Sequence, residues 1–163
     1  MQRISPCMWF DGNAEEAAKF YVSIFKNSKM GRIAHYPEAG KEIHGRKPGS
    51  VMTVEFTLDG QQYLGLNGGP QFKFSEAVSY MVYCKDQAEI DYYWEKLSAD
   101  GGKEVECGWL KDKFGFSWQI VPEELLKLLD DPEKKERVLL EVWKMKKLDI
   151  ATLKRAYEGK KAA

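Results

Sequence analysis

The fold is decided by residues 5–21, SPCMWFDGNAEEAAKFY, and by residues 78–94, VSYMVYCKDQAEIDYYW. Each stretch has a run of apolar and aromatic residues, then a short polar turn, then residues with the spacing of an amphipathic helix. The pattern occurs twice, and its period is longer than that of a solenoid repeat. This indicates a duplicated supersecondary module rather than a repeat array.

Both helices begin with the signature of a capping box. Asn13 is followed three residues later by Glu16, and Asp86 is followed by Glu89 in the same way. In a capping box these side chains accept hydrogen bonds from the first free backbone N–H groups of the helix. The spacing therefore predicts a helix start at each of the two positions.

Segments typical of strands follow each helix. Residues 51–58 alternate between apolar and polar side chains, and Asp59-Gly60 then predicts a tight hairpin to residues 61–67. We predict an α+β fold of two tandem βαβββ modules, at about residues 1–70 and 75–122, which form one domain with a curved mixed sheet shaped as a cup. Helices predicted over residues 123–163 form a C-terminal extension, and its narrow apolar stripe favours an add-on that the core can partly do without.

Composition limits the class of protein. The chain has 163 residues and a formal net charge of zero, which argues against a nucleic-acid partner. Three widely spaced cysteines form neither a disulfide framework nor a zinc pattern, and they favour a reducing compartment. No apolar stretch is long enough for a signal sequence or a membrane span, so we expect no membrane partner and a cytoplasmic location.

Three segments carry a resemblance to a known family. They are residues 6–17 (PCMWFDGNAEEA), residues 66–70 (LNGGP) and residues 107–122 (CGWLKDKFGFSWQIVP), with a further motif at residues 146–150 (KKLDI). They resemble the PhnB-like branch of the vicinal oxygen chelate superfamily, which carries the label 3-demethylubiquinone-9 3-methyltransferase. Glyoxalase I, extradiol dioxygenases and bleomycin-resistance proteins are also in this superfamily. The resemblance implies paired βαβββ modules. The residues do not support the methyltransferase label. A typical methyl-donor site has a glycine-rich loop between a strand and a helix, whereas the glycine pair Gly68-Gly69 precedes Pro70 and no helix is predicted directly after it.

The resemblance also implies a metal cup, and this sequence departs from it. The positions that match the metal ligands of relatives are Pro6, Ser79 and Gln119. Proline has no donor atom in its side chain, and serine and glutamine are weak ligands beside histidine and glutamate. The two histidines, His35 and His44, fall on a short strand and in a charged loop, away from the matched strands. We expect no bound metal and no cofactor.

Strand parity predicts which side chains line the cup. Polar residues recur at alternate positions on several strands, and they include two of the matched ligand positions. The expected lining is Glu55, Tyr63, Asn67, Ser79, Tyr83 and Gln119, with Trp109 at the rim and apolar walls such as Met8 and Met81. A polar lining between apolar walls suits a small, partly planar organic ligand.

Glu55 is the candidate catalytic residue. A carboxylate in a partly apolar cup could act as an acid or a base. It could equally pair with a lysine or arginine of a partner subunit. Cys107 has no histidine nearby in sequence and is interpreted as a small core residue, and core packing is also the more common fate of Trp118.

Three functions remain open at this point. The first is a metal-free small-molecule binding protein of the PhnB-like branch. The second is an enzyme, either metal-dependent after all, as a lyase or dioxygenase, or using Glu55 as a general base. The third is a dimeric scaffold without a ligand. In each case we expect a homodimer, because open sheets leave edges that natural proteins cover or pair.

Overall fold

The computed structural model describes residues 3–160, and the chain divides into two compact units, Met1–Lys73 and Phe74–Ala163. Each unit contains one of the predicted modules, and the second also contains the C-terminal helices. The predicted α+β class with two βαβββ modules and helices at the C-terminal end is confirmed. No helix within residues 3–160 is long and apolar enough to cross a membrane.

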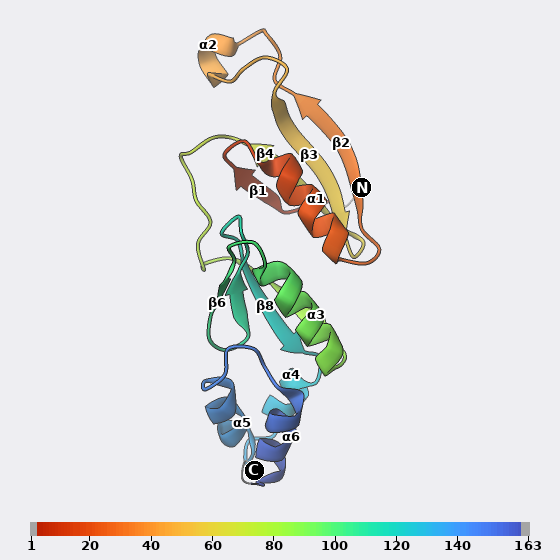
Figure 1. The fold of residues 1–163 in the computed structure, drawn as a ribbon, viewed down its shortest axis with the longest axis vertical. Helices are drawn as coiled ribbons and strands as arrows, with labels where there is room; N and C mark the ends of the chain where they lie inside the picture. The colour runs from red at the N-terminus through yellow and green to blue at the C-terminus, as the bar shows by residue number, and fades with distance from the viewer. Residues whose placement is uncertain (1–2, 161–163) are drawn as a thin grey trace. The chain divides into compact units, whose positions relative to one another are not determined.

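The first unit is a four-stranded sheet with one helix packed on it (Figure 1). Its strands lie in the order β1-β4-β3-β2, with β1 parallel to β4 and the other pairs antiparallel. The elements are β1 (Cys7–Phe10), α1 (Ala14–Ile24), β2 (Lys29–His35), α2 (Lys41–His44), β3 (Val51–Leu58) and β4 (Gln61–Asn67). The short helix α2 lies within the loop between β2 and β3, so the module is βαβββ with one insertion.

The alternation of β3 explains how the sheet binds its helix. Val54, Phe56 and Leu58 are buried, and β3 packs against α1, whose buried residues include Ala17 and Tyr21. Burying apolar side chains on one face of a strand is the main stabilisation of such a layer. The predicted hairpin is confirmed, because Asp59 and Gly60 both have positive φ angles and Leu58 lies opposite Gln61.

The second unit repeats the arrangement of the first. Its sheet order is β5-β8-β7-β6, so in both sheets the first strand lies beside the last. Its elements are β5 (Ser79–Cys84), α3 (Gln87–Ser98), β6 (Lys103–Glu104), β7 (Trp109–Lys111) and β8 (Ser117–Pro122). The shared strand order confirms the duplication that the sequence predicts.

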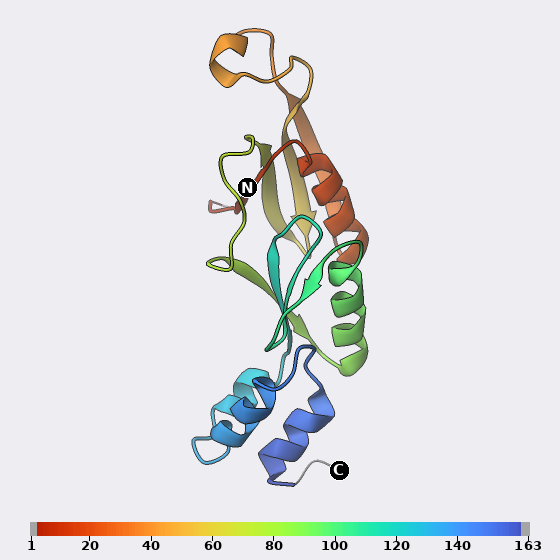
Figure 2. The ribbon, with the colours of Figure 1, turned by 60° about the vertical axis from the view of Figure 1, so that its left-hand side comes forward.

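The C-terminal extension packs into the second unit. Its helices are α4 (Leu125–Leu129), α5 (Lys135–Val142) and α6 (Ile150–Glu158), and Figure 2 shows them at one end of the sheet. They share a buried cluster with β8 that consists of Val121, Val138, Val142, Leu148 and Leu153. Pro122 is the last residue of β8, and Leu148 lies in the loop between α5 and α6.

Backbone bonds also tie the extension to the sheet. The N–H groups of Cys107 and Gly108 donate to the carbonyls of Met145 and Lys146, at 2.7 and 2.8 Å. The Gln87 side chain donates to the Leu148 carbonyl at 3.1 Å and accepts from the Ile150 N–H at 2.9 Å. The extension is therefore bonded to both the β6–β7 loop and the start of α3.

The helix starts behave differently in the two modules. Asp86 caps α3 as predicted, since its carboxylate accepts from the Glu89 N–H at 2.9 Å. The predicted cap of α1 is wrong, because the side chain of Asn13 makes no capping hydrogen bond. Asn67, at the end of β4, does this instead by accepting from the Ala14 N–H at 2.9 Å.

Candidate functional site

Each module has one sheet face that its own helix does not cover. Direct neighbours across paired strands share a face, and successive residues along a strand alternate between faces. In the second unit, Gln119 lies directly opposite both Met81 and Trp109. The face of β5, β7 and β8 that points away from α3 therefore carries a set that we call the second-unit open face: Ser79, Met81, Tyr83, Trp109 and Gln119.

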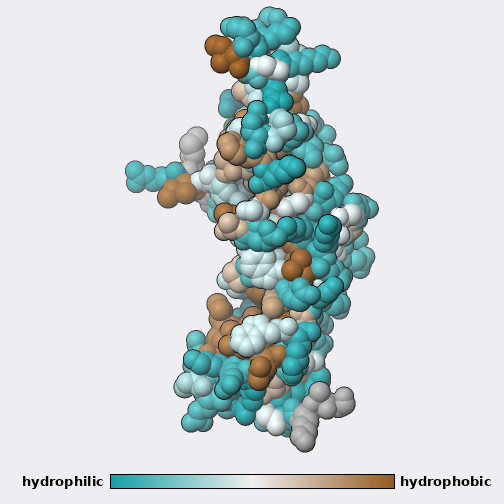
Figure 3. Space-filling view, turned by 90° about the vertical axis from the view of Figure 1, so that its left-hand side faces the viewer, coloured by the Kyte–Doolittle hydropathy of each residue, from teal (hydrophilic) through white to brown (hydrophobic). Residues whose placement is uncertain are grey.

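The polar residues of the second-unit open face are bonded to each other. Gln119 donates from Nε2 to Oγ of Ser79 at 2.8 Å, which joins the first and last strands of the module. The hydroxyl of Tyr83 donates to Sδ of Met81 at 3.5 Å. Met81 and Tyr83 are 43% and 48% exposed. On the face of the chain drawn in Figure 3, hydrophobic side chains lie at the surface among hydrophilic ones. The result is a small surface with polar, thioether and aromatic groups side by side.

Buried residues bound this face at both ends. Val121 is in the same row of β8 but is covered by the helices of the extension, where it packs with Val138 and Leu148. At the other end Ser117 is 1% exposed, and its hydroxyl has no hydrogen-bond partner. The surface open to a ligand is therefore the middle of the sheet, between these two positions.

The structure does not bring the predicted first-module residues together on one face. Glu55 lies opposite Leu64, on the face of β3 turned away from α1. Its side chain is 49% exposed and pairs with Nε of Arg32, on β2 of the same chain, at 3.4 Å. The carboxylate is thus at the surface, and its cation comes from the neighbouring strand.

Tyr63 and Asn67 point to the helix side of the sheet, contrary to the predicted lining. Tyr63 lies opposite Phe56 and stacks on its ring with centroids 5.3 Å apart, and burial raises the pKa of the Tyr63 hydroxyl. Asn67 is 5% exposed and donates to the Val51 carbonyl at 3.0 Å, in addition to capping α1. Both residues therefore stabilise the fold of the first module.

The wall predicted at Met8 is also on the helix side. Met8 is 3% exposed and lies opposite Gly65, where an added Cβ atom would lie 3.2 Å from Cβ of Ala14 on α1. The neighbouring residue Trp9 lies on the other face, and the sequence analysis missed it. Its indole N–H donates to the Gly69 carbonyl at 2.7 Å, and its ring meets Phe72 edge-on at 4.9 Å. The alternation along β1 was the signal that could have found it.

The glycine pair of the LNGGP segment is explained by this same contact. A Cβ atom on Gly68 would collide with the Trp9 ring, so no larger residue fits there. Arg46 donates to the Gly68 carbonyl at 2.6 Å and lies 4.0 Å from the Asp11 carboxylate. Gly68-Gly69 is therefore a structural turn that closes over Trp9, and no helix follows it before β5.

The residues at the matched ligand positions do not fit a divalent metal. Ser79 and Gln119 are hydrogen-bonded to each other, and Pro6 has no side-chain donor. Within residues 3–160 no group of three His, Cys, Asp or Glu side chains is placed to hold a metal ion. His44 orders its loop, accepting from the Arg46 N–H at 3.0 Å, while His35 lies exposed on β2.

The remaining candidates have structural environments. Trp118 is buried and donates to the Asp112 carboxylate at 2.8 Å, so it belongs to the core. Cys107 packs beside the buried cluster of the extension and is only partly buried. Trp109 is half-buried at the second-unit open face.

Comparison with known proteins places this fold in a family. A family model described as 3-demethylubiquinone-9 3-methyltransferase matches residues 2–121. A solved structure from Bacillus cereus, described as a putative 3-demethylubiquinone-9 3-methyltransferase and PhnB protein, is 34% identical to this chain. The match covers 74% of this chain and 99% of that one, with a TM-score of 0.65. The chain belongs to this PhnB-like family.

The resemblance seen in the sequence is thereby confirmed for both modules. A second structure, protein PA1353 from Pseudomonas aeruginosa, has the same fold at 17% identity and a TM-score of 0.60, covering 76% of this chain and 98% of that one. No curated protein matches the chain. The PhnB-like family model ends at residue 121, so the extension, with its KKLDI motif, lies outside the matched residues.

Proposed function

We propose that this PhnB-like protein binds a small, partly planar organic molecule on the second-unit open face, without a metal ion. The observation that carries the proposal is the Gln119–Ser79 hydrogen bond with Met81, Tyr83 and Trp109 around it. Binding sites for small molecules combine apolar and aromatic walls with a few placed polar groups. This face has that composition within one sheet.

Exposure supports a ligand for this face. Met81 and Tyr83 are large side chains on strand β5, and each has nearly half of its surface in contact with solvent. A planar ligand would remove that surface from water, at a gain of about 25 cal/mol for each Å² of apolar area. The tyrosine ring offers a stacking surface, while Gln119 and Ser79 offer donors and acceptors at the edge of a ring.

The same geometry supports binding without a metal. The Gln119 amide donates one N–H to the Ser79 hydroxyl, which orients both groups, and its carbonyl oxygen and the Ser79 O–H are the acceptor and the donor that they offer to a ligand. Neither is a ligand that a transition metal selects, and serine would need an unusual deprotonation to bind zinc tightly. The residues of the second-unit open face can therefore recognise an organic ligand through hydrogen bonds and ring stacking.

Ligand-observed NMR with a library of small aromatic and heteroaromatic compounds tests this proposal. We expect hits whose signals are lost for the Tyr83→Ala variant. Tyr92→Ala is the matched control, because Tyr92 is a similarly exposed tyrosine on α3, at 42%. Hits that persist equally in both variants, or an absence of hits, would refute binding at this face. Elemental analysis of the purified protein tests the metal, and one equivalent of zinc, nickel, iron or manganese would refute that part.

We further propose a homodimer in the cytoplasm. Each described sheet has two edge strands, β1 and β2 in one and β5 and β6 in the other, and natural proteins pair or cover such edges. All three cysteines are free thiols, as a reducing compartment favours. Light scattering at micromolar concentration that gave a monomer mass would refute the dimer.

A further inference from the structure

We infer that the extension holds a second binding site, for the phosphoryl group of a small soluble molecule, in a cavity of about 350 Å³ between α5 and α6. Four basic side chains and one acidic side chain line this cavity: Arg137, Lys144, Arg155, Lys160 and Glu141. In a chain whose net charge is zero, this is a strongly cationic hollow. It shares no residue with the second-unit open face.

The two arginines of the cavity lack the carboxylate partners that Arg32 and Arg46 have. Arg32 and Arg46 each lie within 4.0 Å of a carboxylate. Among residues 3–160, no ion pair joins Arg137 or Arg155 to a carboxylate, and the Nε atom of each is buried without a hydrogen-bond partner. The Asp149 carboxylate feels the charge of Arg155, which helps to lower the Asp149 pKa, but it forms no ion pair with the guanidinium. A half-buried guanidinium that no carboxylate contacts is costly, and an anion that binds beside it recovers that cost.

The other charged side chains of the cavity already form ion pairs or hydrogen bonds within the chain. Lys144 pairs with Glu141 at 2.8 Å, and Lys160 pairs with Glu158 at 2.7 Å. Arg137 donates to the Tyr157 carbonyl at 2.7 Å, which satisfies the C-terminal end of α6. Within the described residues, the guanidinium of Arg155 donates one hydrogen bond, to Thr152 Oγ1, one turn earlier in its own helix, at 2.8 Å.

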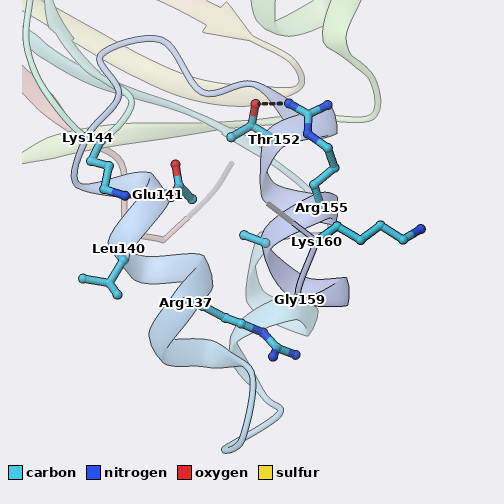
Figure 4. A pocket seen from close by; sticks show the side chains of 9 residues that line it. Arg137, Leu140, Glu141, Lys144, Thr152, Arg155, Gly159 and Lys160 are labelled. Atoms are coloured by element: carbon cyan, nitrogen blue, oxygen red, sulfur yellow. Dashed lines mark hydrogen bonds and ion pairs between the residues drawn. The ribbon is translucent and has the colours of Figure 1, made fainter. Parts of the chain in front are cut away.

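The guanidinium of Arg155 is therefore the charged group of the cavity that is most available to bind a ligand. Figure 4 shows Arg155 and Thr152 on α6, with Glu141 of α5 and Lys144 of the turn after α5 across the cavity. A phosphoryl group has several acceptor oxygens and two negative charges, and it matches the planar fork of a guanidinium better than a monovalent anion does. The cavity exceeds the size of free phosphate, which favours a phosphate monoester.

Calorimetric titration of the full chain at low ionic strength tests the site, with inorganic phosphate in one arm and glycerol phosphate in the other. We expect saturable binding in at least one arm with a Kd of about 1 mM or tighter. Arg155→Gln should weaken it about tenfold or more, because one charge-assisted contact is lost. Lys154→Gln is the matched control, since Lys154 is on α6 but pairs with Glu124 outside this cavity, and it should change binding less than about twofold.

A second variant keeps the test independent of folding. Glu141→Gln removes the one acidic side chain among the described residues that line the cavity, and it frees Lys144, so binding should tighten about threefold or more. Tighter binding in the monoester arm identifies an ester as the ligand class, and equal binding in both arms identifies phosphate itself. Binding that does not saturate in either arm, or that is unchanged in both Arg155→Gln and Glu141→Gln, would overturn the inference.

Discussion

The Nε2 atom of Gln119 lies 2.8 Å from Oγ of Ser79, and this hydrogen bond joins the last strand of the second module to its first. Both positions match metal ligands of relatives in the vicinal oxygen chelate superfamily, according to the resemblance in the sequence. Here they form a neutral pair beside exposed aromatic and thioether groups. The same place in the fold therefore offers hydrogen bonds and stacking to a ligand.

Removing the cap that Asn67 gives to α1 should destabilise the first module. We expect Asn67→Ala to lower the free energy of unfolding by about 2 to 3 kcal/mol, because it leaves the buried Ala14 N–H and the Val51 carbonyl without their partner. Asn13→Ala should cost less than about 0.5 kcal/mol, since its side chain makes no capping bond. Urea unfolding of the two variants measures the difference, and a larger loss for Asn13→Ala would contradict the assignment.

This pair of asparagines shows which parts of the fold the sequence could predict. Asp86 caps the helix that directly follows it, so its role is visible locally. Asn67 caps a helix that begins 53 residues earlier, and only the parallel pairing of β1 with β4 brings the two together. A local pattern cannot report such a partner, and the nearest capping residue, Asn13, was predicted in its place.

The sequence holds enough information to show which sheet face the side chains of β4 occupy, although the predicted face of Tyr63 and Asn67 differs from the observed one. The two-residue turn at Asp59-Gly60 fixes Leu58 opposite Gln61, and hence Phe56 opposite Tyr63. The segment QQYLGLN itself does not alternate clearly, so its local pattern does not show which face of the sheet its polar residues occupy. In the second module, β5 lies directly beside β8 and runs parallel to it. Ser79, Tyr83 and Gln119 share one face of this pair, as predicted from the sequence.

The extension should be needed for the stability of the second unit, although its narrow apolar stripe favoured the opposite expectation. Leu148 is fully buried, and Leu148→Ala should lower the free energy of unfolding by about 3 kcal/mol through the cavity it leaves. Leu126→Ala is the control, because Leu126 is 56% exposed and should cost less than about 1 kcal/mol. A chain ending at residue 131 that unfolds as cooperatively as the full chain would show that the extension is dispensable.

The three cysteines should differ in reactivity. Burial, followed by the negative charges of Glu89, Asp86 and Glu123, raises the pKa of Cys84 to about 12 from an ordinary value of 9.0. Burial also raises the pKa of the Cys7 thiol, but Cys7 is exposed. Because the thiolate is the reactive form, Cys84 in the folded chain should resist iodoacetamide until the pH approaches 12, whereas Cys7 should react before it. Peptide mapping by mass spectrometry checks this order, and alkylation of Cys84 as fast as that of Cys7 would contradict it.

The start of α6 should contribute a pH-dependent part of the stability. Asp149 accepts from the Thr152 N–H at 2.7 Å, and its hydrogen bonds to Thr152 lower the pKa of its carboxyl below 3.8. Its contribution is therefore fully present above pH 3.8 and is lost as the pH falls through the lowered folded-state pKa. Asp149→Ala should cost about 1 kcal/mol at neutral pH.

Replacing Asp149 by asparagine is the matched control for the pH dependence of this cap. Asp149→Asn keeps a side-chain oxygen for the Thr152 N–H but has no proton to gain, so its stability should vary less with pH in the acid range. Urea midpoints measured from neutral pH downward compare the variants. Equal acid sensitivity of Asp149→Asn and the unmodified chain would rule out this carboxylate as a source.

The catalytic role predicted for Glu55 can be separated from binding. The carboxylate is half-exposed and paired with Arg32, so Glu55→Gln should lower the free energy of unfolding by no more than about 1 kcal/mol. We also expect this variant to bind the aromatic hits of the NMR screen as the unmodified chain does. Any turnover detected with a hit and abolished by Glu55→Gln would establish the catalytic role instead.

Chemical-shift mapping tests the central claim most directly. A ¹⁵N-labelled chain is titrated with the strongest aromatic compound from the screen, and the shifts of assigned amides are followed. The account predicts that the largest changes fall on the second-unit open face, at Ser79, Met81, Tyr83, Trp109 and Gln119, and that adding a metal chelator leaves them unchanged. Changes centred on the α3 side of the sheet, or changes that the chelator abolishes, would contradict it.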